Sequence, residues 1–275
     1  MISLSDFLKE REMLNWKILK RFLKIYCKYR WHKEHEWLNK MRPLILDDAK
    51  KFLSENNLLY ESNMERLAEK WLDYVKMFNP DSPEEFYLGW KGERGASNIV
   101  ANIFDQLSRP YIASALIEQL GYKFRGDILD FGCNTAAISL LWQRQIAKDS
   151  RLFLADVENL ARDFVRYEIK KYTEYKTEIV DVNLENVKDN SLDCVLCIDV
   201  LEHLKNPSEV FALIDGKLKH WGILILQSPW GGHPEHLKEA PMDWNKRGGK
   251  KLLRSNYELI KRFIPFVLSG IYRKI

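Results

Sequence analysis

The stretch that decides the fold reads Asp127-Ile128-Leu129-Asp130-Phe131-Gly132-Cys133-Asn134-Thr135-Ala136-Ala137-Ile138-Ser139. It opens with an apolar run that contains an acidic residue near its end, and a short turn then leads into a helix expected from about Ala136 to Gln145. Gly132 lets the backbone come close to a ligand, and Asn134 tolerates a positive φ. A strand, a tight turn and a helix in this order are typical of a nucleotide-type binding site.

Beyond this stretch, short apolar runs alternate with helical segments. The expected strands are Asp127–Phe131, Leu152–Ala155, Thr177–Val180, Asp193–Ile198 and Gly222–Gln227. A further helix is expected from about Pro207 to Leu218. Strands that alternate with helices predict a parallel, doubly wound sheet. Ligands of such sheets bind at the carboxyl ends of the strands.

Before this stretch the pattern is helical, with apolar residues recurring every three or four positions. The expected helices span residues 4–29, 46–52, 64–75 and 99–121, the last ending at Gly121. Pro80 and Pro83 cannot lie inside a helix and predict a linker. We therefore expect a helical N-terminal region in residues 1–80, a linker and lead-in helix in 81–121, and an α/β domain in 122–275.

Composition sets further limits. The chain has 275 residues, a formal charge of +4 and 46% apolar residues, which is ordinary globular composition and does not require a polyanionic partner. No run of 18 apolar residues predicts a membrane span, and no signal peptide is evident. Cys194 and Cys197 lie in an expected strand whose alternation points them to opposite faces, so we interpret them as buried thiols rather than a redox or zinc pair. We expect a reduced, cytoplasmic protein.

The motif resembles that of the class I S-adenosylmethionine-dependent methyltransferases. In this family an acidic residue is followed by glycines at alternate positions: Asp130 and Gly132 match, whereas Asn134 and Ala136 stand where further glycines are usual. The continuation of the fourth strand, Val200-Leu201-Glu202-His203-Leu204, is closely similar to the family's Val-Leu-Glu-His-Leu. The same element and the missing glycines count against the alternative, a dinucleotide-binding dehydrogenase domain.

The resemblance covers about residues 121–228 and implies a Rossmann-like, doubly wound, mostly parallel seven-stranded α/β sheet with S-adenosylmethionine as cofactor. It implies that Asp130 orients the amino end of the cofactor, that Asp156 binds the ribose hydroxyls and that Asp181 contacts the adenine amino group. The alternative for Asp156 is a purely structural role, as a cap at the end of its strand. The expected cofactor-binding set is Asp130, Gly132, Cys133, Asn134, Asp156, Val157, Asp181, Val182, Asp199 and Val200.

The loop after the fifth strand leaves the same edge of the sheet. It runs from Ser228 to Leu237 and contains two glycines, so Trp230 can cover the crevice as part of a movable lid. The candidate catalytic residues are His233, His236 and Tyr111. An ordinary polar lid is the alternative. A metal site with Glu235 is a weaker one, because no further ligand cluster is evident, and no metal is expected.

The N-terminal region is both basic and aromatic. Seven cations between Lys17 and Lys33 are interleaved with aromatic residues from Trp16 to Trp37. Three interpretations stay open: an amphipathic bundle that roofs the substrate pocket, a groove for an acidic partner such as a peptide, and a surface for RNA or membrane. No RNA-binding module is evident, so nucleic acid is not expected.

The segment Gly89–Gly95 is expected to be an ordered loop near the active site. Arg94 and Arg109 can hold a carboxylate or form surface salt bridges. The expected function is methyl transfer to an oxygen or nitrogen of a small-molecule acceptor, such as a specialised metabolite. The alternatives are a peptide or protein methyltransferase, for example on a carboxylate, and a non-catalytic cofactor-binding partner.

Overall fold

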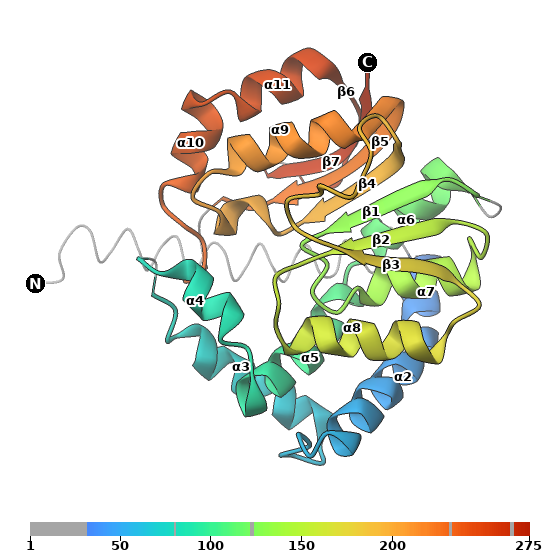
Figure 1. Ribbon diagram of the computed structural model, residues 1–275, viewed down its shortest axis with the longest axis vertical. Coiled ribbons are helices and arrows are strands. Elements are labelled where there is room, and N and C mark those ends of the chain that lie inside the picture. Colours follow the sequence, from blue (N-terminus) through green and yellow to red (C-terminus); the bar gives the residue numbers. More distant parts are fainter. Residues whose placement is uncertain (1–31, 80, 122–123, 231–232, 265–266) are drawn as a thin grey trace, which may run out of the picture.

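The computed structural model describes residues 32–79, 81–121, 124–230, 233–264 and 267–275. Within these ranges seven strands form one sheet in the order β3-β2-β1-β4-β5-β7-β6 (Figure 1). The strands are β1 (Asp127–Phe131), β2 (Arg151–Ala155), β3 (Lys176–Val180), β4 (Leu192–Ile198), β5 (Leu218–Ser228), β6 (Tyr257–Arg262) and β7 (Leu268–Lys274). Strands β1 to β5 are parallel, and β7 is antiparallel to both neighbours. The doubly wound, mostly parallel seven-stranded sheet is confirmed.

The five strands expected from apolar runs are all present. The bounds agree within one residue except for β5, which begins four residues earlier than expected. Leu218 pairs with Leu192, the register then shifts, and the regular pairing resumes between Ile223 and Cys194. Trp221, at a φ of 67°, lies in this irregular start. A sequence pattern of regular alternation does not detect such a bulged beginning.

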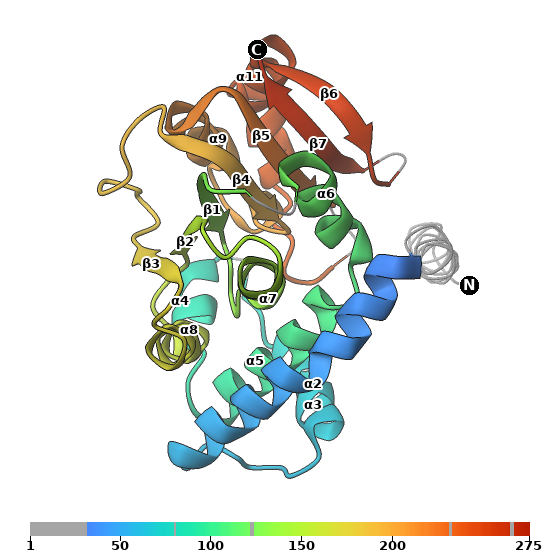
Figure 2. The same ribbon diagram turned by 90° about the vertical axis from the view of Figure 1, so that its right-hand side faces the viewer.

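Helices cover both faces of the sheet (Figures 1 and 2). The helices α7 (Ala137–Gln145) and α8 (Leu160–Lys171) pack on one face, and α9 (Pro207–Lys217), α10 (Ala240–Lys246) and α11 (Gly249–Asn256) pack on the other. Successive strand residues enter opposite cores because strand side chains alternate. Cys194 and Cys197 follow this rule: each is a buried free thiol, and they lie in different cores. The interpretation of this Cys-x-x-Cys as two separate thiols is confirmed.

Five helices in the described part of the chain precede the sheet: α2 (His32–Glu55), α3 (Met64–Val75), α4 (Pro83–Leu88), α5 (Gly92–Gln106) and α6 (Pro110–Leu120). All of them except α4 contribute residues to the core that contains α7 and α8. The start of α3 is set by Asn63, whose side chain accepts hydrogen bonds from the backbone N–H groups of Glu65 and Arg66. The helix expected over residues 4–29 lies outside the described residues, as does the basic and aromatic pattern up to Trp31.

Two helix predictions are wrong. The single helix expected over residues 99–121 is two helices, because Pro110 opens α6 and Arg109 before it leaves the helical region, with φ −111° and ψ 69°. The expected loop Gly89–Gly95 is mostly helix: α5 begins at Gly92, and Gly95 lies inside it against the backbone of Trp90. Glycine there serves close packing rather than a loop.

Polar contacts attach the N-terminal region to α8 and to the residue that follows it. Asp48 of α2 pairs with Lys171 and accepts a hydrogen bond of 2.8 Å from the Tyr172 hydroxyl. The backbone N–H of Leu160 donates to the Trp90 carbonyl at 3.0 Å. The division of the chain into 1–80, 81–121 and 122–275 stays a prediction. Among the described residues, no helix has both the length and the apolar character needed to cross a bilayer.

Candidate active site

The turn after β1 is built from left-handed residues. Gly132, Asn134 and Ala136 have φ values of 70°, 48° and 51°. The N–H groups of Gly132 and Cys133 donate to the Ala155 carbonyl at 2.8 and 3.2 Å, which ties the turn to the end of β2. A side chain on Gly132 would overlap Val200, which packs there. The turn therefore requires glycine at this position, and the positive φ expected of Asn134 is present.

Asp156 lies at the end of β2, directly beside this turn. Its two carboxylate oxygens accept hydrogen bonds from the N–H groups of Asn134 at 2.6 Å and Val157 at 2.7 Å. Burial raises the pKa of Asp156, and the two backbone hydrogen bonds oppose that rise. A carboxylate offers about four lone-pair sites, so two remain for other donors.

Asp130 is buried near the end of β1 rather than exposed at the edge of the sheet. It is 8% exposed and accepts a 2.6 Å hydrogen bond from the Ser139 hydroxyl of α7. Burial raises its pKa to about 7, although the Ser139 hydrogen bond lowers it. Close to it in sequence, the buried side-chain oxygen of Asn134 has no hydrogen-bond partner. Cys133 is also buried, which raises the pKa of its thiol.

The end of β3 is connected to β2 by one arginine that the sequence did not single out. Arg162 donates to the Asp156 carbonyl at 2.6 Å and lies 3.5 Å from both the Val180 carbonyl and a carboxylate oxygen of Asp181. The Asp181 side chain is 65% exposed, and Val182 is also exposed. Asp181 and Val182 thus lie exposed directly after the end of β3.

At the end of β4, Asp199 is held by residues from two segments, β5 and the turn before α6. It accepts a 2.7 Å hydrogen bond from the Gln227 side chain and forms a 2.7 Å ion pair with Arg109. The buried Tyr111 hydroxyl donates to Gln227 at 2.8 Å, and burial raises the pKa of Tyr111. Arg109 also pairs with Asp105. Arg109 therefore holds a carboxylate of this chain, and Tyr111 retains its proton.

Side chains of helix α5 hold the turn after β1 by hydrogen bonds. The Gln106 side chain donates to the Cys133 carbonyl at 3.0 Å and accepts from the N–H of Ile138 at 3.3 Å. Asn102 accepts from the Thr135 hydroxyl at 3.2 Å. The sequence analysis did not predict these two residues, because nothing in the sequence shows which turn a polar residue on a helix will contact.

Helix α4 crosses the carboxyl ends of the strands. The hydroxyl of Tyr87, in α4, lies 2.9 Å from Nδ1 of His203, which follows β4. The backbone carbonyl of Tyr87 accepts a 3.5 Å hydrogen bond from the side chain of Asn159, which follows β2. Trp71, Phe78, Phe86 and Trp90 form a cluster of ring contacts around it. We call α4 with this aromatic cluster the roof. Arg94 lies over the Phe86 ring at 4.2 Å, within the roof.

The histidines of the loop after β5 meet the segment after β4. His236 Nε2 lies 4.0 Å from a carboxylate oxygen of the buried Glu202, whose other oxygen accepts a 2.8 Å hydrogen bond from Ser228. His233 lies 3.6 Å from the carboxylate of Glu235. Burial lowers the pKa of His203 to about 4 and raises that of Glu235 to about 7. His236 thus lies beside Glu202, in the segment after β4, and the His233 ring lies against His236, whereas Tyr111 belongs to the Asp199 network.

Comparison with known proteins identifies the domain. Residues 129–226 match the protein family described as methyltransferase domain. The chain carries a class I S-adenosylmethionine-dependent methyltransferase domain. This family implies S-adenosylmethionine as the cofactor. No curated protein sequence matches the chain.

Two solved structures are similar to this methyltransferase. An S-adenosylmethionine-dependent methyltransferase from Aquifex aeolicus has 14% identity and a TM-score of 0.46, over 72% of this chain and 99% of that one. A candidate S-adenosylmethionine-dependent methyltransferase from Methanococcus maripaludis has 17% identity and a TM-score of 0.43, over 64% of this chain and 91% of that one.

The residues of the methyltransferase crevice fit this cofactor. The two remaining lone-pair sites of Asp156 suit a pair of ribose hydroxyls, and the unpartnered oxygen of Asn134 is a buried acceptor that a donor group can satisfy. Gly132 keeps the turn free of a side chain. Ala136 stands where the family motif usually has glycine. It nevertheless adopts the left-handed conformation of the turn, with a φ of 51°.

Proposed function

We propose that this chain transfers the methyl group of S-adenosylmethionine to an oxygen or nitrogen atom of a small-molecule acceptor. The observation that carries the choice of acceptor is the roof. Tyr87 contacts the segments after β2 and after β4 through its carbonyl and its hydroxyl, so α4 lies across the crevice. A covered crevice favours a small acceptor over a folded protein surface and excludes water from the reacting groups.

The roles of the residues follow from their contacts. Asp156 binds the ribose, Arg162 keeps the ends of β2 and β3 in register, and Asp181 reaches the adenine from the open side. When bound, S-adenosylmethionine supplies a methyl group on a sulfonium that leaves readily. An acceptor must only be held in line behind that methyl group, at about 3–3.5 Å.

A base is needed if the acceptor is a hydroxyl or an amine. We propose His233 for this role, since its ring lies 3.6 Å from the Glu235 carboxylate, which favours an imidazole that accepts a proton. Tyr111 suits a positioning role instead, because its hydroxyl donates to Gln227 and its raised pKa keeps it protonated.

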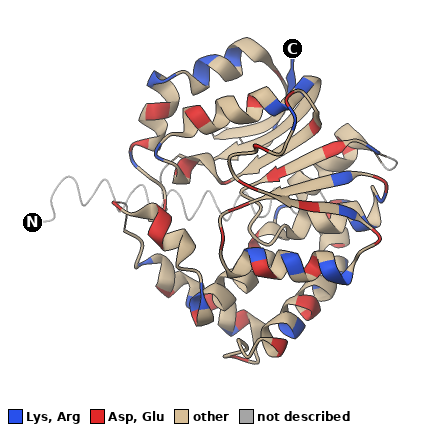
Figure 3. Ribbon diagram, viewed as in Figure 1, with Lys and Arg blue, Asp and Glu red and all other residues tan. Residues whose placement is uncertain are grey.

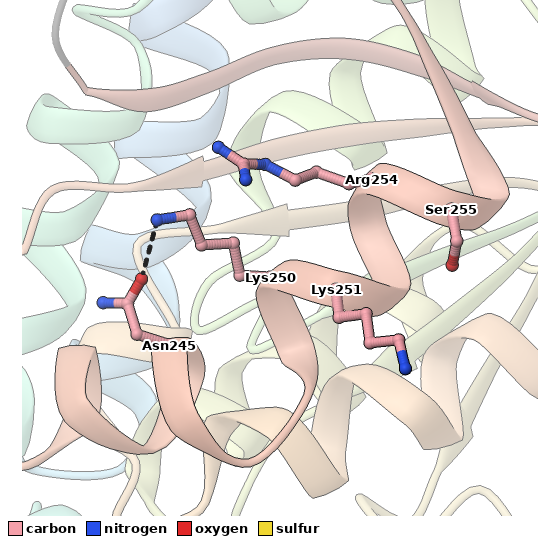
Figure 4. Close-up of a pocket in the computed structure, with 5 residues that line it drawn as sticks. All are labelled: Asn245, Lys250, Lys251, Arg254 and Ser255. Carbon is pink, nitrogen blue, oxygen red and sulfur yellow. Dashed lines mark hydrogen bonds between the residues drawn. The ribbon is translucent and has the colours of Figure 1, made fainter.

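One observation favours the alternative, a peptide or protein acceptor with acidic character. Lys and Arg gather along α11 (Figure 3), and a hollow of about 570 Å³ there is lined by Asn245, Lys250, Lys251, Arg254 and Ser255 (Figure 4). Such a basic surface can attract an acidic segment. The hollow is separate from the crevice, so it supports docking rather than chemistry.

The test uses S-adenosylmethionine labelled in its methyl group. The protein is incubated with a set of small hydroxyl and amine compounds and, separately, with acidic peptides. We expect label in small products together with S-adenosylhomocysteine, and much less label with Asp156→Ala at a limiting concentration of S-adenosylmethionine. Label in peptides alone would favour the alternative, and a wild type that does not bind S-adenosylmethionine would exclude both.

A further inference from the structure

Three side chains with metal-binding atoms converge beside the crevice. One ligand atom each from Glu202, His203 and His236 lies within 4.8 Å of the others. They come from two segments: Glu202 and His203 follow β4, and His236 lies in the loop after β5. Val200, two residues before Glu202, packs on Gly132 of the cofactor turn, so this cluster borders the proposed methyl-transfer site.

The buried carboxylate of Glu202 is incompletely satisfied. Glu202 is fully buried, one oxygen accepts from Ser228 at 2.8 Å, and the other has no hydrogen-bond partner although His236 lies 4.0 Å away. A buried carboxylate of this kind is costly unless a cation or further donors compensate it. A divalent cation between Glu202 and the two imidazoles would supply that compensation.

The contacts of His203 favour one tautomer. Its Nδ1 lies 3.1 Å from the backbone carbonyl of Glu235, which can only accept, and 2.9 Å from the Tyr87 hydroxyl, which can accept as well, so a proton on Nδ1 suits both contacts. The lone pair of the neutral ring is then on Nε2. A histidine that donates one N–H to a backbone carbonyl and presents the other nitrogen is the usual arrangement of a metal ligand.

We propose that Glu202, His203 and His236 bind one divalent transition-metal ion, such as Zn²⁺, which activates a hydroxyl group of the acceptor. Two imidazoles and one carboxylate suit Zn²⁺, Co²⁺ and Mn²⁺ and leave a position open for a substrate oxygen. The substrate class is therefore a compound with a hydroxyl group as the methylated site. This proposal rests on the proposed methyl transfer.

The transfer step balances as an O-methylation. The acceptor hydroxyl, made more acidic by the ion, loses its proton to the imidazole of His233, the proposed base. Its oxygen forms a bond to the methyl carbon as the bond from that carbon to sulfur breaks. The electron pair of the broken bond returns to sulfur, and S-adenosylhomocysteine is released.

The test measures metal binding by the full chain, with Zn²⁺ and Co²⁺ alone as probes. The variants are His236→Ala and Glu202→Gln, which keeps the shape of the side chain, and the control is His220→Ala, an exposed histidine at the other end of β5. We expect one bound ion per chain in the wild type and in the control, and affinity at least tenfold weaker in both variants. Absorption of bound Co²⁺ in the visible range should report nitrogen and oxygen ligands.

Binding of S-adenosylhomocysteine, measured by calorimetry without metal, separates this proposal from the proposed function. We expect it to be unchanged within about twofold in His236→Ala, because the contacts described for that residue are to Glu202 and to the rings of His203 and His233. No metal binding by the wild type, or undiminished binding in both variants, would overturn the metal site while cofactor binding stands. If His236→Ala fails to fold, Glu202→Gln alone decides.

Discussion

The hydroxyl of Tyr87 lies 2.9 Å from Nδ1 of His203, although 116 positions separate the two residues in the chain. Their rings also meet edge to face, with centroids 5.9 Å apart. The pair connects the roof to the segment after β4. It therefore couples the docking of the N-terminal helices to the geometry of the proposed acceptor site.

The two parts of this contact can be separated by substitution. Tyr87→Phe removes only the hydroxyl and should reduce the free energy of unfolding by about 0.5–1.5 kcal/mol, the usual value of one hydrogen bond. Tyr87→Ala also removes the partly buried ring and should cost about 3 kcal/mol, the lower end of the range for an aromatic side chain in a core. Urea unfolding of both variants measures the difference. Equal losses would mean that the ring contributes little and that the roof is not packed as described.

The ribose assignment predicts unequal effects for two aspartates. Asp156→Ala should weaken binding of S-adenosylhomocysteine at least tenfold, because a lost charged hydrogen-bond pair is worth about 1.5–3 kcal/mol. Asp181→Ala should have a smaller effect, since its side chain is 65% exposed and water replaces its contacts. Calorimetry on both variants makes the comparison, with Asp189→Ala as an exposed control. Unchanged affinity in Asp156→Ala would contradict the placement of the ribose.

Much of this site could be predicted because its signals are local. Asp130, Asp156 and Asp181 each lie at or just after the end of a strand, and a short apolar run is visible without any knowledge of its partners. The break at Pro110 was also a local signal, since proline starts helices as readily as it ends them. It was missed because the apolar pattern continues on both sides of it.

The remaining contacts depend on tertiary packing. Arg162 and Gln106 lie on helices where each looks like an ordinary solvated residue, yet one joins two strand ends and the other supports the turn. The pairing of His203 with Tyr87 joins segments that share no sequence pattern. The sequence places Glu202 and His203 in a family motif but gives no sign that the fold brings His236 beside them.

The buried carboxyl of Asp130 predicts a pH dependence of stability. Its pKa rises from an ordinary value of 3.8 to about 7 on folding, so the folded protein favours the protonated form. This contribution is fully present below about pH 4 and is lost as the pH rises toward 7. Asp130→Asn should therefore lessen the fall in the free energy of unfolding between about pH 5 and 7.5. Glu235 has a shift of the same sign, so part of the fall should remain. Parallel curves for variant and wild type would show that Asp130 is ionised in the folded protein.

Ala136 holds a conformation that costs a residue with a Cβ about 1–2 kcal/mol. Ala136→Gly removes that strain, which stabilises the folded protein. The loss of a buried methyl group destabilises it by about 0.8 kcal/mol, and the greater flexibility of the unfolded chain destabilises it by roughly a further 0.4–1 kcal/mol. The effects nearly cancel, and thermal unfolding should show a change within about 1 kcal/mol. Ala136→Val should destabilise by several times more, because a β-branched side chain fits this φ poorly and the site is fully buried. Similar stability of the glycine and valine variants would argue against the left-handed turn.

Arg144 and Glu168 form a buried ion pair of 2.7 Å between α7, which follows the cofactor turn, and α8, which carries Arg162. Glu168 is fully buried, and Arg144 also lies 3.8 Å over the Tyr172 ring. Glu168→Ala leaves an arginine cation buried without its partner and should cost about 3–5 kcal/mol of stability. Replacing both residues, as Arg144→Met with Glu168→Leu, removes the charges together and should recover most of that loss, because apolar side chains of similar volume avoid the desolvation of two ions. Urea unfolding of the single and double variants measures the two losses of stability. A double variant no more stable than Glu168→Ala would mean that the ion pair itself stabilises the two helices, and that the unpaired arginine is not the cause of the loss.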